Sequence, residues 1–264
     1  DQIGPFAHSV SDAAKILEVI AGKDKNDATS IQSDAKKYDL KAQTKVKLAY
    51  FKQALESDGL GAEVKAAFGD LKEKLIEEGH QVEAIDFPYL DYLIPSYYVL
   101  STAEASSNLS RYDGVHYGYR SPNASNMEEV YTKSRSEGFG TEVKNRIMLG
   151  TFVLSAGYYD AYYTKAQQVR RLLKIKMNEV YQNHDFLVSP TAPNTAFKFG
   201  EKSEDPVAMY LEDIFTVLAN LVGNPAISLP LYSSKAGLPI GMQLMANDLE
   251  EEKLLGFAKQ IELS

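Results

Sequence analysis

The sequence contains no cysteine among its 264 residues. Disulfide bonds, thiolate metal sites and a cysteine nucleophile are therefore excluded. Histidine is also scarce, since the chain has only His8, His80, His116 and His184. The sequence has no Gly-x-Ser-x-Gly turn, whose serine a catalytic histidine would activate. It also has no His-Glu-x-x-His motif and no Gly-x-x-x-x-Gly-Lys loop. These absences argue against a Ser-His-Asp hydrolase, a zinc hydrolase and a phosphate-loop enzyme. His80 follows a helix end and His184 lies in a polar turn, so we expect both side chains to be exposed.

Long apolar runs and basic clusters are missing as well. No stretch reaches the roughly 18 apolar residues that span a bilayer, so no membrane contact is expected. The formal net charge is −8, so the average field would repel a nucleic-acid backbone. The basic residues that do gather lie in the middle of the chain and are more typical of a solvated helix face with mixed charges. They are Arg135, Lys144, Arg146, Lys165, Arg170, Arg171, Lys174 and Lys176.

Hydrophobic periodicity predicts an α/β fold. Residues 46–51 and 81–87 alternate like strands, and residues 59–79 between them have the spacing of an amphipathic helix. This order is a βαβ unit, in which the strands pair in parallel and helices pack on the sheet. With 44% hydrophobic and 24% charged residues, the composition is that of an ordinary globular protein.

Helical spacing dominates residues 94–183, which we expect to form a mainly helical segment inside a single domain over residues 1–264. The predicted helices there are 96–109, 127–133, 142–155 and 159–181. An earlier helix over 13–21 would be capped by Ser9 or Ser11.

The last third of the chain returns to strands. Pro206 and Asp248 each stand at the favoured start of a helix, and residues 226–232 and 239–245 have the spacing of a hairpin. The predicted elements are 186–188, 206–221, 226–232, 239–245 and 248–261. The fold class is therefore α/β, with a mixed central sheet in an α/β/α layered arrangement.

Two features stand out chemically. Residues 96–114 are rich in small and hydroxyl side chains, which would permit the close approach of another backbone or of a substrate. Arg146 and Asp213 each lie in an otherwise apolar helical pattern, so we expect both to be buried. Buried charges need partners, which are either each other or a zwitterionic ligand such as a free amino acid.

These segments resemble the amidase-signature family, and most closely the A subunits of the glutamyl-tRNA(Gln) and aspartyl-tRNA(Asn) amidotransferases. The resemblance runs in order along essentially the whole chain, beginning at the opening residues Asp1-Gln2-Ile3-Gly4-Pro5. The segments that carry it are 97–114, 134–140, 144–151, 155–163, 189–193, 205–213, 220–230 and 237–244.

The resemblance implies a reaction. In such proteins a lysine, a cis-serine and a nucleophilic serine hydrolyse glutamine, and the ammonia amidates misacylated Glu-tRNA(Gln) or Asp-tRNA(Asn). The resemblance implies cytoplasmic partner subunits B and C in a heterotrimer, with ATP and magnesium used by the partner, and no cofactor or metal in this chain. It also assigns Arg146 to the α-carboxylate of glutamine, Asp213 to its α-ammonium group, and Tyr97 to the wall of the same pocket.

The sequence departs from the family at the catalytic segment. No Gly-Ser-Ser-Gly run occurs in residues 1–264, and the family's lysine and serines precede the motif at which this chain opens. We therefore expect a chain truncated at its N-terminus, with no catalytic residue of its own and no activity alone. Two alternatives stay open: a stand-alone amidase acting on other small amides, and a non-catalytic structural or binding fragment.

Overall fold

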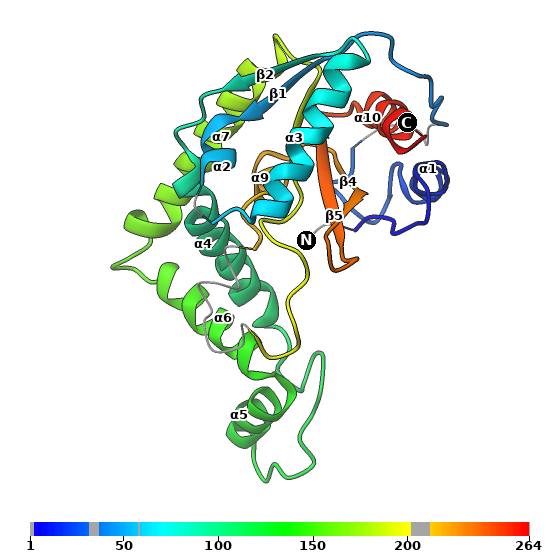
Figure 1. Ribbon diagram of the computed structural model, residues 1–264. Helices are drawn as coiled ribbons and strands as arrows, with labels where there is room; N and C mark the ends of the chain where they lie inside the picture. The colour runs from blue at the N-terminus through cyan, green and yellow to red at the C-terminus, as the bar shows by residue number, and fades with distance from the viewer. Residues whose placement is uncertain (1–2, 32–36, 58, 202–211, 264) are drawn as a thin grey trace. The chain divides into compact units, whose positions relative to one another are not determined.

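The computed structural model describes residues 3–31, 37–57, 59–201 and 212–263 (Figure 1). It divides into two compact units. Unit 1 comprises Asp1–Leu90 and Leu173–Ser264, and unit 2 comprises Asp91–Leu172. Among the helices in the described ranges, none is both long and apolar enough to cross a membrane.

Unit 1 is built on a five-stranded mixed sheet. Its strand order is β2 (Gln81–Ile85), β1 (Lys47–Phe51), β3 (Phe186–Pro190), β5 (Pro239–Ala246) and β4 (Ala226–Ser233). β1 pairs in parallel with β2 and β3, whereas β5 runs antiparallel to β3 and β4. The predicted mixed sheet, the βαβ unit and the C-terminal hairpin are all confirmed.

The helices of unit 1 cover this sheet. They are α1 (Val10–Ile20), α2 (Lys52–Glu56), α3 (Ala62–Glu77), α9 (Val217–Val222), α10 (Glu251–Leu263) and the second half of α7 (Lys165–Tyr181). Figure 1 shows α3 in front of the sheet, with α10 beside it and α7 behind. The Ser9 hydroxyl caps α1 by accepting a hydrogen bond from the Asp12 amide, which confirms one of the two predicted caps.

The core of unit 1 lies around β3, every residue of which is buried. The Phe186 ring stacks on Phe257 of α10 with centroids 4.8 Å apart. Phe51 at the end of β1 and Phe87 just after β2 also stack, with ring centroids 4.0 Å apart. Burial of each such ring stabilises the fold by roughly 1.5–3 kcal/mol, so these pairs stabilise the sheet that carries the C-terminal motifs.

Unit 2 is helical, and contains α4 (Leu90–Leu109), α5 (Met127–Gly138), α6 (Thr141–Val153), the π-helix η1 (Asp160–Thr164) and the first half of α7. α4 and α6 cross closely, because a Cβ added at Gly150 would collide with the Thr102 carbonyl oxygen and the Ser106 side chain. The Ser106 and Thr151 hydroxyls are hydrogen bonded at 3.0 Å across this crossing. The small residues of 96–114 thus serve a tight helix crossing.

Three local predictions need correction. The helix expected over 206–221 begins only at Val217, since residues 212–216 form turns; the part of that prediction over 206–211 lies outside the described residues. Asp248 does not cap α10, which begins three residues later; its carboxylate instead accepts hydrogen bonds from Lys174 and Asn224. The helix expected over 159–181 opens as a π-helix rather than an α-helix. The opening residues Asp1 and Gln2 lie outside the described part.

Candidate functional site

Tyr97 and Arg146 belong to one cluster in unit 2. Tyr97 lies on α4 and Arg146 on α6, and these are the two helices that cross at Gly150. The Tyr97 and Tyr98 rings meet edge to face with centroids 5.3 Å apart. The guanidinium carbon of Arg146 lies 5.9 Å from the centroid of the Tyr98 ring. Tyr98 therefore contacts both of the residues that the family resemblance places in one pocket.

The side chain of Arg146 is partly exposed, so its predicted burial is wrong. It is 39% exposed, and its Nε donates a 2.9 Å hydrogen bond to Glu142, one turn earlier on α6. An exposed pair at this spacing contributes only a few tenths of a kcal/mol. The apolar neighbours of Arg146 on α6 do not form a buried face around it, since Met148 is 71% exposed and Leu149 is 44% exposed. Arginine presents a planar fork of donors that matches a carboxylate, and in this chain the fork lies over the aromatic face of Tyr98.

Asp213 lies in unit 1, just before α9, and its side chain is exposed rather than buried. Its backbone carbonyl accepts hydrogen bonds from the Thr216 amide at 3.0 Å and the Val217 amide at 3.1 Å. This turn holds the residue at the start of α9. The burial prediction fails because residues 212–216 form turns instead of a helix, and Phe215 is the one residue of these five that is buried.

A buried glutamine fixes the segment that carries Asp213. Gln243 on β5 is 5% exposed, and its Nε2 donates to the Phe215 carbonyl oxygen at 2.8 Å. The same nitrogen lies 3.3 Å from the Ser189 hydroxyl on β3. Apart from its place in the Gly-Leu-Pro-Ile-Gly-Met-Gln-Leu motif, Gln243 carries no signal in the sequence, because its partners are far away in the chain.

The last motifs of the chain meet at one end of the sheet. The Thr191 hydroxyl is hydrogen bonded to the Ser228 hydroxyl at 2.7 Å, and the Thr191 amide donates to the Gly241 carbonyl oxygen at 2.9 Å. A Cβ at Gly241 would lie 2.9 Å from the Thr191 hydroxyl, so only glycine fits there without a shift. The hydroxyl of Thr191 bonds to another hydroxyl instead of to a base, which is not the arrangement of an activated nucleophile.

The histidines are structural or lie at the surface, and the predicted exposure of two of them is wrong. His80 is 4% exposed; its Nδ1 accepts a 3.3 Å hydrogen bond from the Val46 amide, and its ring lies edge-on to Phe257. Burial lowers the pKa of His80, which favours the neutral ring. The His184 side chain is 9% exposed and hydrogen bonds to Glu83 at 2.8 Å.

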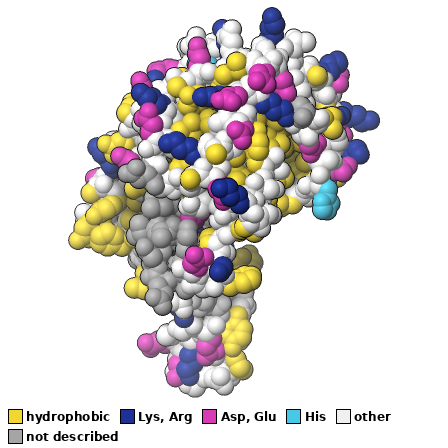
Figure 2. Space-filling view, viewed as in Figure 1, with side chains coloured by type: hydrophobic (Ala, Val, Ile, Leu, Met, Phe, Trp, Pro, Cys, Tyr) yellow, Lys and Arg dark blue, Asp and Glu magenta, His cyan; other side chains and the backbone are white. Residues whose placement is uncertain are grey.

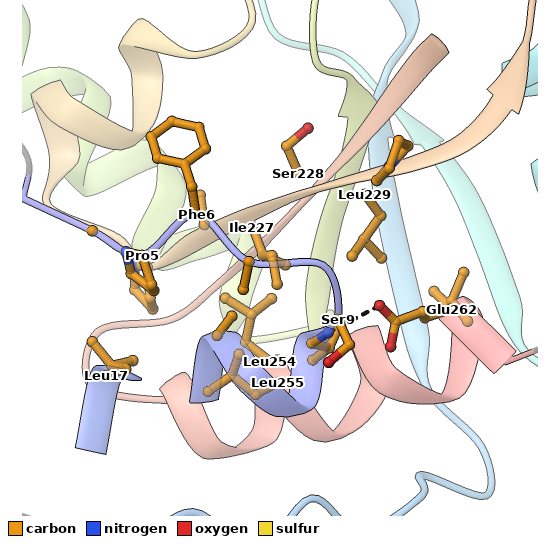
Figure 3. A pocket seen from close by; sticks show the side chains of 18 of the residues that line it. Pro5, Phe6, Ser9, Leu17, Ile227, Ser228, Leu229, Leu254, Leu255 and Glu262 are labelled. Carbon is orange, nitrogen blue, oxygen red and sulfur yellow. Dashed lines mark hydrogen bonds between the residues drawn. The ribbon is translucent and has the colours of Figure 1, made fainter. Parts of the chain in front are cut away.

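An apolar groove of about 990 Å³ runs along β4 in unit 1 (Figure 3). Residues of the N-terminal segment, β4 and α10 line it, among them Pro5, Phe6, Ile227, Leu229, Leu254 and Leu255. A 2.9 Å hydrogen bond from the Val10 amide to the Glu262 carboxylate joins α1 to α10 in the wall of the groove. None of Tyr97, Arg146 and Asp213 lines this groove, whose lining also includes His8, Lys74 and Glu251.

A family model described as Amidase matches residues 1–255. The chain is 51% identical, over 264 residues, to the A subunit of glutamyl-tRNA(Gln) amidotransferase from Koribacter versatilis, covering 99% of this chain and 55% of that protein. It is 47% identical, over 270 residues, to the protein of the same name from Nostoc sp., covering 100% of this chain and 55% of that protein. The chain thus spans about half the length of these curated relatives.

Comparison with solved structures points to the same family. The crystal structure of the A subunit of glutamyl-tRNA(Gln) amidotransferase from Thermotoga maritima matches with a TM-score of 0.77 and 38% identity, covering 99% of this chain and 52% of that one. A structure described as an amidase matches with a TM-score of 0.73 at 22% identity, covering 98% and 52%, and supports the fold alone. A family match over nearly all of the sequence, on this mixed sheet with these C-terminal motifs, shows that the chain belongs to the amidase-signature family.

Proposed function

We propose that this chain acts as part of the glutaminase subunit of a tRNA-dependent amidotransferase. The observation that carries the proposal is the Tyr97–Tyr98–Arg146 cluster, in which an arginine fork lies over an aromatic face on two tightly crossed helices. Such a fork suits the α-carboxylate of a free amino acid. Likeness to A subunits at about half identity supports glutamine as that amino acid.

Arg146, Asp213 and Tyr97 are assigned distinct roles. Arg146 binds the α-carboxylate, Asp213 binds the α-ammonium group, and Tyr97 lines the pocket. A charge-assisted hydrogen bond to a carboxylate contributes about 1.5–3 kcal/mol. Because these contacts touch the backbone atoms of glutamine and not its side-chain amide, they position the substrate and take no part in bond cleavage.

The chemistry would come from a serine–cis-serine–lysine set that has no counterpart motif in residues 1–264. A lysine with a lowered pKa would take the serine proton, and the acyl-enzyme formed with release of ammonia would be hydrolysed by water. Alone, this chain is proposed to be inactive. Within the longer protein it would supply ammonia to partner subunits B and C in the cytoplasm, where the partner uses ATP and magnesium to amidate Glu-tRNA(Gln) or Asp-tRNA(Asn).

The test uses a full-length protein that carries this chain, assembled with its partner subunits. Arg146→Ala is expected to raise the glutamine KM at least tenfold, while amidation supplied with free ammonia stays within twofold of the unsubstituted complex. Arg171→Ala on α7 is the matched control, since Arg171 is an exposed arginine of the same unit. Loss of ammonia-dependent amidation in Arg146→Ala would contradict the assignment.

A stand-alone amidase on the same fold is the second candidate. Dependence of turnover on partner subunits and on tRNA separates the two. A binding fragment without catalysis would associate with partners and release no ammonia even in the full-length form.

A further inference from the structure

The loop that follows α4, here called the tyrosine loop (residues 110–121), exposes large side chains. Tyr117 is 61% exposed, Tyr119 50%, Tyr112 44% and Val115 43%. Figure 2 shows hydrophobic side chains gathered along this loop, beside α5. Exposed apolar side chains that stand together, instead of singly, are typical of a surface that another molecule covers.

The tyrosine loop is held in one shape by its own hydrogen bonds. The Asp113 carboxylate accepts the Val115 and His116 amides, each at 2.8 Å, and the His116 ring at 2.8 Å. The hydrogen bond from the His116 ring, together with the two amides, holds the pKa of Asp113 well below its usual range. Gly114 follows with φ +78°, a conformation that glycine adopts without strain, and its amide donates to the Tyr117 carbonyl.

Helix α5 anchors the loop from the other side. The Glu137 carboxylate accepts the Tyr119 hydroxyl at 2.8 Å and the Ser121 hydroxyl at 3.2 Å. The Ser134 hydroxyl accepts the Ser121 amide at 3.0 Å, and Arg135 donates to two carbonyl groups where α4 ends. The motif over residues 134–140 therefore builds the tyrosine loop. A loop fixed before binding loses little conformational entropy when a partner docks.

The charge of the loop indicates what docks there. Arg111 and Arg120 are exposed at its two ends, while its one acid, Asp113, is engaged inside the loop. Tyrosine and arginine around an apolar centre are the composition of protein interfaces. The chain's net charge of −8 disfavours a nucleic acid as the occupant.

We propose that the tyrosine loop is a docking surface for a partner protein that presents an apolar patch with an acidic rim. This inference rests on the proposed function, because an amidotransferase subunit must join the subunit that receives its ammonia. Tyr117 and Val115 would enter the partner's apolar patch. Arg111 and Arg120 would face the acidic rim, which makes association faster and sensitive to salt.

The experiment measures association of the full-length protein with its purified partner subunits, at two salt concentrations. The double variant Val115→Ala/Tyr117→Ala is expected to raise the dissociation constant about tenfold or more. The double variant Arg111→Glu/Arg120→Glu is expected to raise it mainly at low salt. Tyr92→Ala, at the first turn of α4 and 54% exposed, is the control and should associate normally.

The outcomes separate this inference from the proposed function. Glutamine-dependent amidation by the loop variants should return at high partner concentration, because docking and not chemistry has been weakened. Unchanged association in both double variants would overturn the inference and leave the proposed function standing. A loss confined to tRNA affinity, or a change confined to self-association of the chain, would also overturn the inference and leave the proposed function standing. An unsubstituted complex without glutamine-dependent amidation would instead overturn the proposed function, whatever the loop does.

Discussion

The side-chain amide of Gln243 donates a 2.8 Å hydrogen bond to the backbone carbonyl oxygen of Phe215. This contact joins β5 to the turn that begins at Asp213, and the residues at both ends of it are buried. Gln243→Leu should leave the Phe215 carbonyl group without its donor and lower the free energy of unfolding by about 1–3 kcal/mol. Urea unfolding of the variant measures this effect.

Gln182→Leu serves as the control for that substitution. Gln182 is exposed beyond the end of α7, so its replacement should change the free energy of unfolding by less than about 0.5 kcal/mol. Equal losses in the two variants would mean that the Gln243–Phe215 contact contributes nothing specific to stability.

A second prediction concerns the crossing of α4 and α6. Gly150→Ala would push a methyl group into the Thr102 carbonyl oxygen and Ser106, and overpacking of this kind costs typically 1–3 kcal/mol. The comparison is Gly69→Ala in α3, where a Cβ meets nothing within 4 Å and the loss of a helical glycine should stabilise by about 0.5–1 kcal/mol. Thermal unfolding should therefore shift in opposite directions, and a stabilised Gly150→Ala would disprove the close crossing.

A third prediction concerns acid stability at the start of α5. Glu129 accepts hydrogen bonds from the Ser125 amide, the Ser125 hydroxyl and Lys133, and these lower its pKa from 4.5 to about 2. A carboxylate with a lowered folded-state pKa stabilises fully above its unfolded value, and this stability is lost as the pH falls through the folded value. Glu129→Gln should therefore be less stable than the unsubstituted chain above pH 4.5.

The two stability curves should converge as the pH falls from about 4.5 to 2, because the native glutamate then becomes neutral as well. Denaturant unfolding at a series of pH values measures the difference. A constant gap across this range would show that the carboxylate charge is not what stabilises the start of α5.

The strands expected over 46–51 and 239–245 both form, because β-forming apolar segments between turn residues are a local signal in the sequence. Sequence periodicity did not say which face of a helix is covered. Arg146 was expected to be buried because of its apolar neighbours, yet Met148 beside it is exposed too. Apolar neighbours in the sequence therefore do not show whether a charged side chain is buried.

Long-range contacts were out of reach for a different reason. His80 was expected at the surface because it follows a helix end, but Phe257, far along the chain, packs against its ring. Similarly, the sequence left open whether the small residues of α4 serve a substrate or a helix crossing. Only the position of Gly150 against Thr102 resolves that choice.

The last prediction concerns Tyr98, which sequence reasoning did not select as a site residue. Its ring face lies 5.9 Å from the guanidinium carbon of Arg146, and a cation–π contact contributes about 0.5–2 kcal/mol, equivalent to roughly 2–30-fold in affinity. If Arg146 binds the glutamine carboxylate, Tyr98→Ala in the full-length complex should raise the glutamine KM by a factor in that range. Tyr98→Phe keeps the ring face and should leave the KM nearly unchanged, and amidation with free ammonia should be normal in both variants. A Tyr98→Phe variant as impaired as Tyr98→Ala would show that the hydroxyl group matters rather than the ring, and that the aromatic face does not orient Arg146.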